Sequence, residues 1–118
     1  MKQARTYIDY IHDIIDAAKD AQEFIAGMDE ESFIIDKRTQ YAVIHTLNVI
    51  GEATKRFPDS LRNRYPEIPW REITGMRDKL SHDYFSINPK RVYETVQRDL
   101  PPLCETMNHI LADSEEEN

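Results

Sequence analysis

The sequence predicts an all-α protein, an up-down bundle of four to five helices. Apolar residues recur at three- and four-residue steps over long segments, which is the period of a helix with one buried face. No segment alternates apolar and polar residues long enough to favour a strand, and glycine contributes only three of 118 residues. The length suits one domain. We therefore expect a helical domain over residues 1–112 and an acidic disordered tail over residues 113–118.

The first half of the chain predicts two long helices. The first runs from Ala4 to Gly27, and its apolar stripe comprises Ile8, Ile11, Ile15, Ala18, Phe24 and Ile25. Asp29 can start a short helical turn, and Asp36 is a suitable N-cap for a second long helix that ends near Arg56. Apolar residues of this second helix fall on more than one face. It is therefore expected to be central, packed by its neighbours or by a second subunit.

Prolines divide the second half of the chain. Residues 58–69 contain three prolines and predict a structured connector with a turn or two of helix at residues 60–65. Pro69 suits the first turn of a third main helix that ends near residues 81–84, with Trp70 as a core anchor. Asn88 and Pro89 form an N-cap and N1 pair for a fourth helix. The pair Pro101-Pro102 is expected to break or bend that helix before helical spacing resumes.

Composition excludes several classes of protein. No run approaches the roughly 20 apolar residues needed to cross a bilayer, and the first residues lead into an acidic helix rather than a signal peptide. The single cysteine, Cys104, excludes an internal disulfide and agrees with a reducing compartment. We expect a cytoplasmic protein without a membrane partner. His12 and Asp16 share one helical face, but two ligands without a third are a weak metal signal, and we expect no metal or other cofactor.

Charge is distributed unevenly along the chain. The formal net charge is −7. Residues 55–91 nevertheless hold nine Lys or Arg against five acidic residues, whereas the segments on either side are acidic. A basic face on an acidic body predicts local, salt-sensitive contact with a polyanion.

The segment from Arg77 to Tyr84 concentrates the residues that can carry chemistry. The chain has no glycine-rich phosphate loop, nucleophile elbow or HExxH motif, whereas Arg77, His82 and Tyr84 lie within eight residues inside the basic stretch. Arginine offers a planar charged fork for phosphate oxygens, and histidine exchanges a proton near neutral pH. These are the two functions needed to cleave RNA without a metal, with the 2′-hydroxyl of the substrate as nucleophile.

Helical geometry constrains how these residues meet. At 100° per residue, Arg77 and Tyr84 lie about 20° apart around a helix, whereas Arg77 and His82 lie about 140° apart. Arg77 and His82 therefore cannot share one face of a straight helix. Either the helix ends or distorts before His82, or a partner subunit completes the site. Spacing alone is also compatible with cations that complement a helix C-terminus.

The order of several short motifs resembles the HepT toxins of the HEPN superfamily from about residue 5 to residue 111. The matching pieces are Arg38-Thr39 with Ala42-Val43, Ile50-Gly51-Glu52-Ala53, Ile68-Pro69-Trp70, and Gly75-Met76-Arg77 through His82-Asp83-Tyr84-Phe85. The resemblance implies a helical bundle that pairs as a homodimer. It implies a metal-independent endoribonuclease site formed by the R-x4-H-x-Y motif in a cleft between protomers. It also implies a nucleotidyltransferase antitoxin that transfers AMP from ATP to the motif tyrosine.

Carried over to this chain, the resemblance assigns a role to each motif residue. Arg77 and His82 match the catalytic pair, Tyr84 matches the AMP acceptor, and Asp78 stands where a polar residue can orient either catalytic group. Arg71 and Lys79 are weaker candidates for guiding RNA. The alternative is a catalytically silent helical module that holds a nucleotide or docks the nucleotidyltransferase without cleaving RNA.

Overall fold

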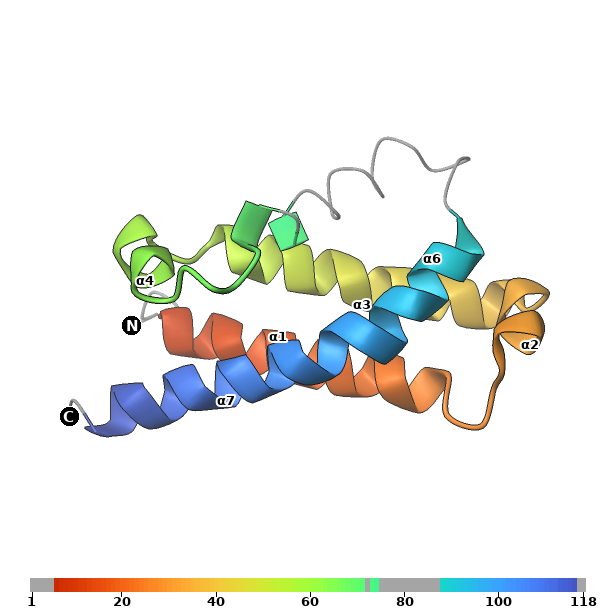
Figure 1. Cartoon of the computed structure of the whole chain (residues 1–118), viewed down its shortest axis with the longest axis horizontal. Coiled ribbons are helices and arrows are strands. Elements are labelled where there is room, and N and C mark those ends of the chain that lie inside the picture. Colours follow the sequence, from red (N-terminus) through yellow and green to blue (C-terminus); the bar gives the residue numbers. More distant parts are fainter. Residues whose placement is uncertain (1–5, 72, 75–87, 117–118) are drawn as a thin grey trace, which may run out of the picture.

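The computed structural model of the protein describes residues 6–71, 73–74 and 88–116, and its described part contains helices and no strand. Three long helices form the body: α1 (Tyr7–Phe24), α3 (Lys37–Lys55) and α7 (Leu100–Glu116). Figure 1 shows that α3 and α7 both run antiparallel to α1. The prediction of an all-α up-down bundle is confirmed.

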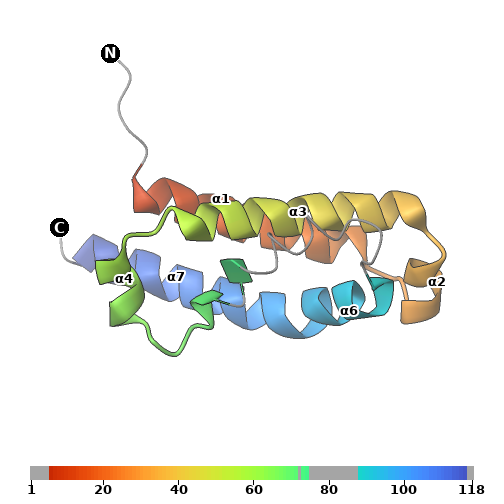
Figure 2. The ribbon, with the colours of Figure 1, turned by 90° about the horizontal axis from the view of Figure 1, so that it is seen from above.

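Helix α1 lies between the other two long helices and contacts both. Figure 2 shows α3 beside α1 along most of its length, with α7 on the opposite side of the bundle. The buried stripe of α1 comprises Ile11, Ile14, Ile15, Ala18 and Ala21, which recur at helical spacing. The expectation that Phe24 belongs to this stripe is wrong, because its side chain is 45% exposed. Phe24 is the last residue of α1, and Ile25 fills the core in its place as the chain turns toward Gly27 at φ 79°.

Two aspartates cap the helices that follow, as predicted. Asp29 accepts a hydrogen bond from the Ser32 amide at 2.8 Å and starts α2 (Glu30–Ile34). Asp36 accepts from the Thr39 amide at 3.1 Å and from the Thr39 hydroxyl at 2.9 Å, and starts α3. In each case these hydrogen bonds to the ionised form hold the pKa of the carboxyl below its ordinary value of 3.8.

The C-terminal half enters the bundle through a short helix and a π turn. Asn88 caps α6 (Pro89–Glu94) by accepting from the Lys90 amide at 3.0 Å, as predicted. A π turn, η2 (Thr95–Asp99), then leads into α7. Of the two predicted effects of Pro101-Pro102, a break or a bend, the break is not found, because α7 continues through both residues. Both prolines lie in the first turn of α7, and the wider π turn immediately before them relieves the clash that their rings would have with the carbonyls four residues earlier.

The acidic C-terminal segment differs from its expectation as a disordered tail, because α7 continues to Glu116. Ser114 is buried, and its hydroxyl lies 2.8 Å from the hydroxyl of Tyr7 at the start of α1. The hydroxyl of Tyr65 donates a hydrogen bond to Asp113 at 2.6 Å. These two contacts tie the last turns of α7 to distant parts of the chain, which the local run of acidic residues does not reveal.

Candidate functional site

Most of the predicted catalytic motif lies outside the described residues. This holds for Arg77, Asp78, Lys79, His82 and Tyr84. Arg71 is described and is exposed on the helical turn that follows Pro69. The structure therefore shows how the flanks of the motif are held, and the roles of the motif residues remain predictions.

The upstream flank is anchored by Trp70. Its side chain is buried, as predicted, and its ring meets that of Phe57 edge-on, with centroids 5.4 Å apart. The indole Nε1 donates to the carbonyls of Tyr65 at 3.0 Å and Arg62 at 3.2 Å. A buried ring with a satisfied polar edge has one stable orientation. The helix that leads toward the motif is thereby fixed against α4 (Asp59–Arg64) and the end of α3.

The downstream flank is held by α6. Val92 is buried, and the Tyr93 hydroxyl donates to the carbonyl of Met28 at 2.7 Å. The rings of Tyr93 and Phe33 pack with their centroids 5.5 Å apart. Helix α6 contacts both α2 and α3. Both flanks of the motif are therefore anchored to the same framework, centred on α3.

The C-terminal end of α3 carries positive charge beside the upstream flank. Arg62 of α4 donates from Nη2 to the carbonyl of Thr54 at 3.0 Å, which places a guanidinium against the last turn of α3. Lys55, Arg64 and Arg71 are exposed on neighbouring segments. Cations at a helix C-terminus complement its dipole.

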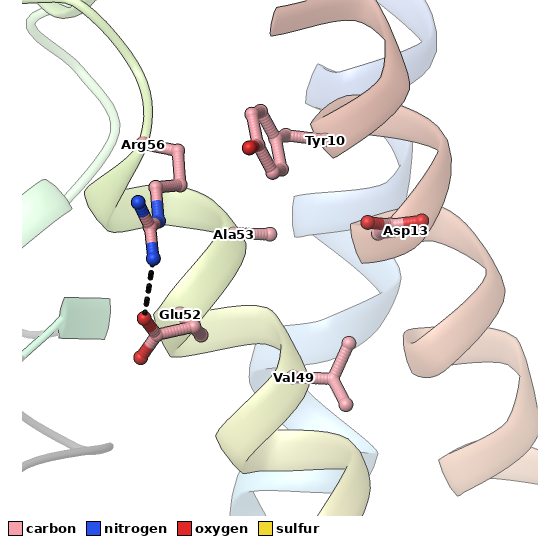
Figure 3. A pocket seen from close by; sticks show the side chains of 6 residues that line it. All are labelled: Tyr10, Asp13, Val49, Glu52, Ala53 and Arg56. Carbon is pink, nitrogen blue, oxygen red and sulfur yellow. Dashed lines mark hydrogen bonds and ion pairs between the residues drawn. The ribbon is translucent and has the colours of Figure 1, made fainter. Parts of the chain in front are cut away.

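A hollow of about 380 Å³ opens on the surface between α1 and α3. It is lined by Tyr10, Asp13, Val49, Glu52, Ala53 and Arg56. Figure 3 shows Tyr10 of α1 pointing toward α3, with Asp13 further along α1; the facing wall comprises three residues of α3 and Arg56, which follows its last residue. Arg56 Nη2 lies 3.4 Å from Glu52 Oε1, one turn away on the same helix, and both side chains are largely exposed at 59% and 44%. Sequence reasoning did not find this hollow, because its walls come from helices that are distant in the sequence.

Asn48 is a second feature that the sequence did not single out. It lies one turn before Glu52 on α3, and its Oδ1 is buried without a hydrogen-bond donor among the described residues. A buried carbonyl left unpaired costs about 1–3 kcal/mol. In the sequence, Asn48 stands out only as an amide side chain within a mostly apolar run. That pattern does not reveal burial, because an amide at this position could equally be exposed.

Within the part of the chain that the structure covers, no cluster of three or more His, Cys, Asp or Glu side chains is arranged to hold a metal ion. The described helices include none with the length and apolar character of a membrane span.

Comparison with known proteins places this architecture in a family. The model of the family "Ribonuclease HepT-like" matches residues 14–110. A relative from Thermococcus cleftensis named "Probable ribonuclease HepT" is 44% identical over 99 residues, 84% of this chain and 90% of the relative. "Putative RNase MJ0125" of Methanocaldococcus jannaschii is 42% identical, covering 91% and 92% of the two chains.

The match extends beyond these two relatives. "Putative RNase TTE0752" of Caldanaerobacter subterraneus is 35% identical over 94% of this chain and 96% of its own length. No solved structure shows a significant match. The aligned regions cover nearly all of the bundle and include the segment from Arg77 to Tyr84. The chain belongs to the HepT-like ribonuclease family.

Proposed function

We propose that the protein is a metal-independent endoribonuclease and the toxin of a HepT and nucleotidyltransferase pair. The observation that carries the proposal is the family match across residues 14–110, which spans an intact R-x4-H-x-Y motif from Arg77 to Tyr84. Relatives over nearly the whole chain are named as ribonucleases. The anchored flanks at Trp70 and Val92 support the proposal, because a catalytic segment needs a rigid framework.

The proposed chemistry uses the RNA strand's own nucleophile. His82 takes the proton from a 2′-hydroxyl, whose oxygen attacks the adjacent phosphorus. The 5′-oxygen of the next nucleotide leaves and takes up a proton, so the products carry a 2′,3′-cyclic phosphate and a 5′-hydroxyl. Arg77 stabilises the charge that develops on the phosphoryl oxygens. DNA lacks the 2′-hydroxyl and is not cut.

The proposed assembly is a homodimer in which the two protomers complete the cleft. The geometry of the motif favours this arrangement, because Arg77 and His82 diverge by about 140° on a straight helix. Exposed apolar side chains support a partner surface: Ile35 is 83% exposed and Tyr41 is 53% exposed. Light scattering during size-exclusion chromatography should give twice the monomer mass of 13.9 kDa.

The proposed regulation is adenylylation of Tyr84 by the partner enzyme. The tyrosine oxygen attacks the α-phosphorus of ATP, a phosphodiester to AMP forms, and pyrophosphate leaves. An AMP group beside Arg77 brings a negative phosphate to the place where the RNA phosphate binds. Co-expression with the nucleotidyltransferase should add the mass of AMP to the Tyr84 peptide, and an unmodified peptide with an active partner would contradict this part of the proposal.

The deciding experiment is cleavage of total RNA in EDTA. Wild-type protein should cut RNA and leave 5′-hydroxyl ends that polynucleotide kinase labels without prior phosphatase treatment. His82→Ala and Arg77→Ala should abolish cleavage. Matched controls are His109→Ala and Arg98→Ala, which remove an exposed histidine and an exposed arginine elsewhere and should leave cleavage intact. Unchanged RNA at high protein excess would favour the silent docking module instead.

A further inference from the structure

Tyr65 connects the C-terminal turns of α7 to the residues that lead into the motif. Its hydroxyl donates to Asp113 Oδ2 at 2.6 Å, and its main-chain carbonyl accepts from Trp70 Nε1 at 3.0 Å. We propose that Tyr65 is a positioning residue: anchored by Asp113 of α7, it restrains Trp70 and, through Trp70, the residues that precede Arg77. Its effect on RNA cleavage rests on the proposed function, whereas the restraint on Trp70 does not.

The contact between Tyr65 and Asp113 joins residues that are 48 positions apart in the sequence. A phenol hydroxyl that donates to a carboxylate at 2.6 Å makes a charge-assisted hydrogen bond, about twice as strong as a neutral one. Figures 1 and 2 both place α4, which Tyr65 directly follows, at the same end of the bundle as the end of α7. On α7, Ile110 and Ser114 are buried on either side of Asp113. The carboxylate is therefore carried by a packed part of the helix.

The main chain of Tyr65 explains why the side-chain contact matters. Its N–H donates to the Arg62 carbonyl at 3.1 Å, and its carbonyl accepts from the Ile68 amide at 3.2 Å as well as from the indole. Tyr65 has left the helix, with φ −130° and ψ 62°, so the helical hydrogen-bond pattern does not fix its orientation. The bond to Asp113 therefore adds a restraint on the direction of the carbonyl that receives Trp70.

Trp70 extends the restraint toward Arg77. The Thr74 hydroxyl donates to the Trp70 carbonyl at 3.1 Å, and the Ile73 amide donates to the Pro69 carbonyl at 3.1 Å. Trp70 and Ile73 are both buried. The chain is thus placed relative to the indole as far as Thr74, three residues before Arg77. Since a misplacement of about 1 Å can cost roughly 10²-fold in rate, a small shift at Trp70 is enough to slow cleavage.

The test follows the indole N–H of the full-length protein by NMR. Trp70 is the single tryptophan of the chain, so the ¹⁵N-labelled protein gives one indole signal. Tyr65→Phe and Asp113→Ala both remove the hydrogen bond between the two side chains, and each should speed the exchange of the indole proton with D₂O at least about fivefold. Asp113→Asn keeps an acceptor oxygen for the Tyr65 hydroxyl, and its exchange rate should stay within about twofold of the wild type.

The matched control is Tyr7→Phe, which removes a tyrosine hydroxyl that lies 2.8 Å from Ser114, the next residue of α7. This variant loses a hydrogen bond at the same end of the bundle but keeps Tyr65 and Asp113. Its indole exchange rate should stay within about twofold of the wild type. An equally large acceleration in Tyr7→Phe would show general loosening of the bundle and overturns the proposal. Unchanged exchange in Tyr65→Phe overturns it as well.

RNA cleavage tests the consequence for catalysis. Tyr65→Phe and Asp113→Ala should lower kcat about threefold or more and leave KM within about twofold, because they alter placement rather than substrate binding. Asp113→Asn and Tyr7→Phe should keep the wild-type kcat. Unchanged kcat in Tyr65→Phe, despite faster indole exchange, overturns the positioning role. Absence of cleavage by the wild type would refute the proposed function, and the exchange rates would still decide whether Asp113 restrains Trp70.

Discussion

Trp70 packs edge-on against Phe57 while its Nε1 donates to the carbonyl of Tyr65, so one side chain holds the approach to the motif against the segment that follows α3 and against the C-terminal end of α4. The apolar ring of the indole packs against Phe57, and its N–H group donates to the carbonyl of Tyr65, which lies in a different segment. Few substitutions can preserve both contacts. Trp70 therefore holds the residues that lead into the motif against the rest of the bundle.

Trp70→Ala should lower the free energy of unfolding by about 3–5 kcal/mol, because it leaves a cavity beside Phe57. Trp70→Phe should cost less, since it keeps an aromatic contact and loses only the indole hydrogen bonds. Urea unfolding followed by circular dichroism measures both. Arg71→Ala is the control. Arg71 directly follows Trp70 and its side chain is exposed, so its loss should change the free energy of unfolding by less than about 0.5 kcal/mol. A Trp70→Ala protein as stable as the wild type would contradict the anchoring role.

The hydrogen bond between Tyr7 and Ser114 should couple the first helix to the last. Tyr7→Phe and Ser114→Ala each remove one partner of the 2.8 Å contact, and each should lower the free energy of unfolding by about 0.5–1.5 kcal/mol. The double variant should cost less than the sum of the two, because the second substitution has no bond left to break. Additive losses in the double-mutant cycle would show that the two hydroxyls do not interact.

Local signals in the sequence correctly predict the N-caps of α2, α3 and α6, whereas the first helix starts at Tyr7, after a Thr6 cap, and not at the predicted Ala4. Asp29, Asp36 and Asn88 each cap a helix where expected, since the side chain and the amides it binds lie within three residues of one another. The buried position of Trp70 also follows from its place after Pro69 in an apolar pattern.

Features that depend on distant residues were not predictable. The helical C-terminal segment depends on Tyr7 and Tyr65, which are 107 and 48 residues away from their partners Ser114 and Asp113. The π turn before Pro101 includes the buried Val96 and is followed by the buried Leu100, and the proline pair alone does not indicate which form the helix distortion takes. The hollow at Tyr10 exists only because a particular face of α3 meets α1. Periodicity indicates that a helix has a buried face, but it does not identify what that face meets.

Acid should destabilise the bundle partly through the cap at Asp36. Its pKa is lowered in the folded state by the hydrogen bonds from Thr39, so the ionised carboxyl stabilises the fold above the ordinary value of 3.8. That contribution is lost as the pH falls from about 4 through the lower folded pKa. Asn also caps helices but does not titrate. Asp36→Asn should therefore resemble the wild type at pH 7 and lose less thermal stability below pH 4. Parallel melting-temperature profiles from pH 7 to pH 2.5 would contradict this assignment.

Tyr84→Phe should separate catalysis from regulation. The variant keeps an aromatic ring of nearly the same size and loses the oxygen that would attack ATP, so RNA cleavage should continue within about threefold of the wild-type rate. The same variant should resist inactivation when it is incubated with the nucleotidyltransferase and ATP, whereas wild-type cleavage should fall by more than tenfold. Tyr93→Phe is the matched control, since its hydroxyl donates to the Met28 carbonyl in the connection between α1 and α2, and its loss should not affect inactivation. A Tyr84→Phe protein that is still silenced would move the modification to another residue, because phenylalanine cannot accept the AMP group.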